Sequence, residues 1–141
     1  MRSFLTIAIC VSAVWSLLAQ GTAYLHADLK NEAHRSAEKY FDLVRYDSAL
    51  FYAEDACRLY RHDSIWLPYV ICGLTGVGVL VEQFNYDSAS RLLDHLELVA
   101  SNHLKPDSYV WSEYYNHKSY VCRKTSKPDS SAYYVRKAIR L

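Results

Sequence analysis

The apolar residues of this chain recur at the spacing of an α-helix over most of its length. In one stretch they occupy every third or fourth position, at Ala49, Ala53, Ala56 and Tyr60. A second stretch repeats the same steps of four, three and four residues, at Ala89, Leu93, Leu96 and Ala100. This spacing places the side chains on one face of a helix, so the pattern predicts helices rather than strands.

Another helical stretch precedes each of these apolar stripes, so the helices are expected to pair as hairpins. Residues 29–44 carry one apolar face, residues 65–84 are nearly all apolar, and residues 109–123 carry aromatic residues at helical spacing. Ser64 and Ser108 stand where N-cap residues are expected. The helix boundaries that follow are about 28–44, 47–61, 64–82, 86–102, 108–124 and 129–141, which predicts an all-α fold.

A short motif recurs at the start of the second helix of each hairpin. Tyr-Asp-Ser-Ala occupies residues 46–49 and again residues 86–89, and a third version, Pro-Asp-Ser-Ser, occupies residues 128–131. The offsets between the copies are therefore 40 and 42 residues. An aspartate at the start of a helix is favourable because its carboxylate lies beside unpaired backbone N–H groups. The motif indicates one structural unit used three times.

These turns resemble those of the tetratricopeptide repeat (TPR) family, whose motif sets a small residue and an aromatic before a Tyr-Asp-x-Ala turn and a second small residue after it. The resemblance covers residues 30–141 and is strongest in the first hairpin. It assigns repeat-packing roles to Ala37, Tyr40, Tyr46, Ala49, Ala56, Tyr86, Ala89, Leu96, Ser119 and Ala138. The family's period is about 34 residues, so other α-hairpin solenoids with a period of about 40 residues remain an alternative.

The resemblance implies a right-handed α-hairpin solenoid of about three TPR-like repeats, at about 28–61, 64–102 and 108–141. In such a stack the first helix of each hairpin lines a concave groove that recognises proteins. The corresponding positions here are His34, Glu38, Phe41, Asp42, Leu74, Gly78, Val81, Glu82, Asn116, Tyr120, Arg123 and Lys124. They run from acidic through apolar to basic, which suits a peptide with a basic end, an apolar middle and an acidic end. The alternative is that they are ordinary core or solvated side chains.

The first 23 residues have the pattern of a secretory signal peptide. Arg2 supplies a positive charge, residues 4–19 form an apolar run, and Gly21 and Ala23 are small residues at a plausible cleavage site. An uncleaved membrane anchor is the alternative, but a bilayer span needs about 20 apolar residues. The helical domain is then residues 24–141, and the protein is expected to be exported to the periplasm or cell envelope.

The charge and the cysteine content of the chain limit the classes of partner and of cross-link that are expected. Removing residues 1–23 deletes one cation, Arg2, and leaves 15 Lys and Arg against 15 Asp and Glu. Without a basic face, nucleic acid is not an expected partner. Cys57, Cys72 and Cys122 fall at apolar helical positions and are interpreted as small core residues, although a disulfide between two of them stays open.

No catalytic, metal or cofactor motif emerges from the sequence. The uncharged run at residues 66–81 is short for a membrane span and is interpreted as a buried core helix. Its glycines lack the strand and Lys-Ser/Thr of a phosphate loop. The histidines show no metal-ligand spacing, and no nucleophile has an identifiable base. The chain is therefore predicted not to be an enzyme and to need no cofactor.

These features predict an interaction scaffold or sensor with a protein or peptide partner. The sequence stops within the last predicted helix, so it is expected to be truncated, and it is similar to the exported front of bacterial signalling proteins. Two alternatives remain. One is a small self-contained exported binding protein, which could self-associate through its uncapped C-terminal end; the other is the repeat front of a longer enzyme such as a peptidase.

Overall fold

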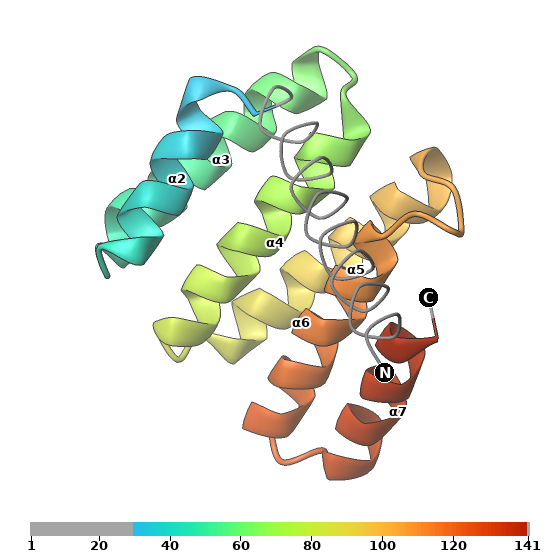
Figure 1. Ribbon diagram of the computed structural model, residues 1–141. Helices are drawn as coiled ribbons and strands as arrows, with labels where there is room; N and C mark the ends of the chain where they lie inside the picture. Colours follow the sequence, from blue (N-terminus) through green and yellow to red (C-terminus); the bar gives the residue numbers. More distant parts are fainter. Residues whose placement is uncertain (1–29, 141) are drawn as a thin grey trace, which may run out of the picture. The chain divides into compact units, whose positions relative to one another are not determined.

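Six α-helices make up the part of the chain that the structure, a computed structural model, describes (Figure 1). The described residues are 30–140, so the predicted signal peptide at 1–23 lies outside them. The helices all belong to one compact unit, Glu32–Leu141. They are α2 (Glu32–Asp42), α3 (Tyr46–His62), α4 (Trp66–Glu82), α5 (Tyr86–His103), α6 (Val110–Lys124) and α7 (Pro128–Ile139). The all-α prediction is confirmed for these residues.

Four of the five connections are the same three-residue turn. Its middle residue has a left-handed backbone, with φ between 56° and 59°, at Val44, Ser64, Phe84 and Ser126. In each turn the next backbone N–H donates to the carbonyl five residues earlier, as from Arg45 to Tyr40 at 2.9 Å. This bond satisfies a carbonyl that the helix end leaves unpaired.

These turns explain the long repeat period. Helices of 17 residues joined by three-residue turns place the starts of α3, α4 and α5 at 46, 66 and 86, which are 20 residues apart. Two such steps make the 40-residue offset between copies of the motif. The second offset is 42 residues because the connection between α5 and α6, residues 104–109, is three residues longer and α5 is one residue longer than α3, while α6 is two residues shorter than α4.

The predicted N-cap roles of Ser64 and Ser108 are wrong. Ser64 occupies the left-handed position of its turn, and Ile65 stands at the N-cap of α4 without a side-chain hydrogen bond. Tyr109 takes the N-cap of α6, while Ser108 accepts a backbone bond from Trp111. The physical reason is that the repeated turn, and not a serine side chain, sets where α4 begins.

Each helix packs against the next one in sequence, and α4 lies at the centre of the packing. α4 contacts α3 and α5 and also lies beside α2 and α6. Most of its side chains are buried, and Gly73 lies against Leu96 of α5. No helix in residues 30–140 is both long enough and apolar enough to cross a membrane.

The positions assigned to repeat packing fall in two groups. Tyr40, Tyr46 and Tyr86 are half-buried. The others are buried, namely Ala37, Ala49, Ala56, Ala89, Leu96, Ser119 and Ala138. Among the described cysteines, Cys72 is buried and Cys57 and Cys122 are half-buried, and no disulfide joins any of the three.

Candidate functional site

The neighbouring helices α2, α4 and α6 enclose two adjoining hollows. The larger has a volume of about 520 Å³ and is lined by Glu38, Phe41, Asp42, Ile71, Leu74, Thr75, Gly78, Tyr109, Glu113 and His117. The smaller has a volume of about 260 Å³ and is lined by Phe41, Gly78, Glu82, Asn116, His117 and Tyr120. Because three residues line both hollows, they form one trough, called the groove below. Its combined size is in the range of small-ligand and side-chain pockets.

Gly78 keeps the two hollows connected. A Cβ atom at this position would stand 3.7 Å from the Phe41 ring and 3.8 Å from Cε1 of His117. A Cβ alone would therefore make ordinary contacts, whereas any longer side chain would occupy the space between Phe41 and His117. The missing side chain gives the groove its depth at the point where α2, α4 and α6 meet.

The charged groups around the groove are carboxylates. Glu38 and Asp42 come from α2, Glu82 from α4 and Glu113 from α6, and among the described residues no Lys or Arg lines either hollow. His117 has a pKa below its usual range because burial disfavours the imidazolium, although Glu113 acts in the opposite direction. The imidazole is therefore neutral at pH 7 and leaves the groove with net negative charge.

No family model matches the chain, and comparisons with curated proteins and with solved structures found no match either. What the groove does must therefore be argued from its own geometry and charge.

Eight of the twelve residues expected in a groove do line the two hollows. They are Glu38, Phe41, Asp42, Leu74, Gly78, Glu82, Asn116 and Tyr120. His34 and Val81 are buried instead, and Nδ1 of His34 lies 3.1 Å from the hydroxyl of Tyr60. The side chains of Arg123 and Lys124 lie over the Tyr120 ring, at 5.0 and 5.3 Å from its centroid.

The expected basic end of the groove is therefore not formed at either hollow. Arg123 and Lys124 belong to the last turn of α6, where both side chains lie over the Tyr120 ring, and neither is among the described residues that line the hollows. The gradient from acidic to basic expected from the sequence is replaced by a trough whose lining charges are negative.

Five lining residues escaped sequence reasoning. Ile71, Thr75, Glu113 and His117 lie one helical turn before, or beside, residues that were expected there, so extending the three-and-four spacing along α4 and α6 would have found them. Tyr109 has no such signal, because it precedes the first residue of α6 at the end of an irregular connection.

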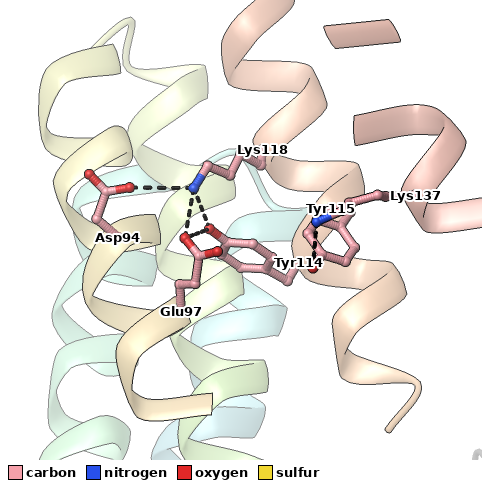
Figure 2. A network of polar contacts seen from close by, with 6 residues as sticks. All are labelled: Asp94, Glu97, Tyr114, Tyr115, Lys118 and Lys137. Atoms are coloured by element: carbon pink, nitrogen blue, oxygen red, sulfur yellow. Dashed lines mark hydrogen bonds and ion pairs between the residues drawn. The ribbon is translucent and has the colours of Figure 1, made fainter. Parts of the chain in front are cut away.

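A polar network joins α5 to α6 outside the groove (Figure 2). Nζ of Lys118 donates to Oε2 of Glu97 at 2.8 Å and to the hydroxyl of Tyr114 at 2.7 Å. The Tyr114 hydroxyl donates in turn to Oε2 of Glu97 at 2.8 Å. Asp94 is farther away, with Oδ1 3.5 Å from Nζ. The ammonium of Lys118, the carboxylate of Glu97 and the phenol of Tyr114 therefore satisfy one another's hydrogen-bonding capacity.

The pKa shifts of this network describe a stable ion pair. Burial lowers the pKa of Lys118, but the hydrogen bonds to Glu97 and Tyr114 outweigh it and raise the pKa overall. Burial raises the pKa of Glu97, but the bonds from Lys118 and Tyr114 bring it below its usual range. The pKa of Tyr114 is raised, chiefly by burial. Lysine stays charged and tyrosine stays protonated, which suits a structural link better than proton transfer.

The charged residues that line a third hollow are cations. It measures about 500 Å³ and is lined by Ser101, Leu104, Pro106, Trp111, Tyr115, Lys137 and Arg140. Nζ of Lys137 donates to the hydroxyl of Tyr115 at 3.5 Å, as Figure 2 shows. Across residues 30–140 no group of three or more His, Cys, Asp or Glu side chains could hold a metal ion.

Proposed function

We propose that this chain is a TPR-like binding module, a right-handed solenoid of three α-hairpins that holds a protein or peptide partner in its groove. The observation that carries the proposal is the groove itself. It runs over the first helices of three successive hairpins, which are the helices that line the concave recognition surface in stacked hairpin folds.

The arrangement of the helices supports a solenoid. The pairs α2–α3, α4–α5 and α6–α7 form antiparallel hairpins, and the first helices α2, α4 and α6 lie in a row. The second helix of each hairpin also packs against the first helix of the next one. Nearest-neighbour packing of this kind is what defines repeat architectures.

The signal-peptide pattern and the family resemblance extend the proposal to location and role. The module is exported to the periplasm or cell envelope and serves as the scaffold or sensor part of a bacterial signalling protein. The polar network that joins α5 to α6 is an internally satisfied ion pair and activates no nucleophile. Recognition, not catalysis, is the role that this geometry favours.

Site-specific photocrosslinking tests the proposal. A photoreactive p-benzoylphenylalanine replaces Phe41 in the groove or, as a control, Phe51 on α3, whose side chain is 64% exposed and lies outside the groove. Irradiation in cells that encode the protein is expected to give discrete protein adducts from position 41 that are absent from position 51. The same adducts from both positions, or none from position 41, would contradict the proposal.

A further inference from the structure

We propose that the partner segment presents a lysine or arginine side chain beside an apolar one, so that the groove selects a cationic peptide. This inference rests on the proposed function and specifies the chemistry of the partner. It replaces the two-ended peptide that the sequence suggested, because Arg123 and Lys124 do not line the groove.

Carboxylates stand on both walls of the larger hollow. Glu38 and Asp42 lie on α2, Glu113 lies on α6, and α4 provides the floor between them. Glu82 continues the same charge into the smaller hollow. A cation placed between these walls is attracted from both sides, whereas an acidic segment is repelled by every charged wall residue.

Among residues 30–140, three of these carboxylates, Asp42, Glu82 and Glu113, take part in no ion pair. The Oε1 atom of Glu38 lies 3.6 Å from Nε2 of the buried His34. By contrast, Glu97 on α5 is already paired with Lys118. The groove therefore concentrates the uncompensated negative charge of α2, α4 and α6 at the place where a partner would sit.

The apolar lining suits the rest of a lysine or arginine side chain. Phe41, Ile71 and Leu74 can pack against its methylene stem, while its charged head reaches the carboxylates of the walls. The rings of Phe41 and Tyr109 add faces that attract a cation. A metal ion fits less well, since these carboxylates do not form a metal-binding cluster in the described residues.

Selection from a random dodecapeptide display library on the full chain tests this inference. Selected peptides are expected to be enriched in Lys or Arg next to an aromatic or aliphatic residue. For a fluorescein-labelled selected peptide, replacing its cation by methionine should weaken binding about tenfold or more, and Glu113→Gln should act in the same direction. Affinity should also fall as salt rises.

Two matched variants identify where the peptide binds. Glu54→Gln removes an exposed carboxylate from α3, outside the groove, and should leave affinity unchanged. Gly78→Leu fills the junction of the two hollows and should block binding, with the melting temperature as a check that the variant is folded. The salt dependence of binding and the affinity for the methionine-substituted peptide are measured with the unaltered chain. These two results therefore do not depend on whether a variant folds.

The outcomes separate the two proposals. If peptides bind in a manner that Gly78→Leu blocks, but lack Lys and Arg or bind equally to Glu113→Gln, the cationic preference is overturned and the groove function stands. If no selected peptide is affected by Gly78→Leu, both the preference and the groove function fail. Lys- or Arg-rich peptides that respond to both Gly78→Leu and Glu113→Gln support both.

Discussion

Gly73 and Gly76 lie one turn apart on α4, yet they meet very different surroundings. A Cβ at Gly73 would stand 2.5 Å from Cδ2 of the fully buried Leu96, whereas one at Gly76 would stand 3.5 Å from Cδ2 of Leu92. Replacing a helical glycine by alanine gains about 1 kcal/mol of helix propensity. Overpacking a core costs about 1–3 kcal/mol, so it exceeds that gain only at Gly73.

The first prediction follows from this difference. Gly73→Ala should lower the free energy of unfolding by about 1 kcal/mol, and Gly76→Ala should raise it by up to about 1 kcal/mol. Urea unfolding of the two variants measures both changes. Equal stabilisation by both substitutions would show that Leu96 moves aside without cost and that α4 and α5 are not tightly packed there.

His117 should make stability depend on pH. Its pKa in the folded protein lies below the unfolded value of about 6.5. As pH falls below about 6.5, the unfolded chain takes up a proton more readily than the folded chain, so stability falls. Burial causes this shift, and Glu113 opposes it. The other charged groups lining the groove, Glu38, Asp42 and Glu82, are carboxylates too.

The second prediction isolates that contribution with His117→Gln. The stability difference between the original chain and the variant should move in favour of the variant when urea unfolding is repeated at pH 5.5 instead of 7.5. Carboxylates also titrate toward lower pH, but they are present in both proteins and largely cancel in the difference. A difference that stays constant between the two pH values would exclude a lowered pKa for His117.

At the scale of elements, the repeated turn is built without glycine. Val44 and Phe84 adopt φ values of 59°, a conformation that costs L-residues about 1–2 kcal/mol and that glycine adopts freely. Val44 is 66% exposed, so its side chain contributes little packing. The turn is therefore held by its backbone hydrogen bonds and by the packing of the two helices that it joins.

The third prediction is that Val44→Gly raises the free energy of unfolding by about 1 kcal/mol. Leu43→Gly is the matched control, because Leu43 is an exposed apolar residue of the same turn with an ordinary backbone conformation. There, glycine should be destabilising, since it only adds freedom to the unfolded chain. Thermal or urea unfolding measures whether each variant is more or less stable than the original chain. A stability change of the same sign in both variants would contradict the backbone strain at Val44.

Sequence reasoning located the helices well because their signal is local and repeated. The spacing of Ala49, Ala53 and Ala56 identifies a helical face without any knowledge of the partner helix. The turns gave no such signal, since Val44 and Phe84 are residues that rarely adopt left-handed conformations. Serine favours caps in general, which predicts an N-cap role for Ser64, but the geometry of the turn overrides that preference here.

The groove was harder to predict than the helices, for a physical reason. Helical spacing tells which residues share a face, and it found Glu38, Phe41 and Gly78. It also places Arg123 and Lys124 three and four residues after Tyr120 on the same helix, within reach of its ring. Spacing does not decide whether these side chains turn to that ring or into the groove, so the charge of the lining depended on side-chain orientation.

The network of α5 and α6 supplies the fourth prediction. Glu97→Gln and Lys118→Met should each destabilise the protein by about 1–2 kcal/mol, because a hydrogen-bonded charge loses its partner in each case. The double variant should cost less than the sum, with a coupling energy of about 1 kcal/mol. Asp94→Asn is the control and should cost less than about 0.5 kcal/mol, since Asp94 is 72% exposed and 3.5 Å away. Additive effects of Glu97→Gln and Lys118→Met would show that the pair contributes nothing.

At the scale of the whole unit, α4 holds the hairpins together. Within the described residues α7 contacts α6 alone, whereas α4 contacts α2, α3, α5 and α6. A disturbance at one end of such a stack must pass through each intervening interface before it reaches the other end. Local stability should therefore vary along the chain, with opening easiest where a helix has the fewest neighbours.

The fifth prediction tests this by amide hydrogen exchange. Tyr134→Ala removes a ring that stacks on Tyr115 at a centroid distance of 6.1 Å, and it should speed exchange in α6 and α7 while leaving α2 and α3 unchanged. Val77→Ala opens a cavity at a fully buried position of α4 and, at a cost of about 2 kcal/mol, should speed exchange in all six helices. If Tyr134→Ala speeds amide exchange equally in all six helices, the helices unfold as one cooperative body. The groove of α2, α4 and α6 would then owe its shape to global stability and not to successive pairwise packing.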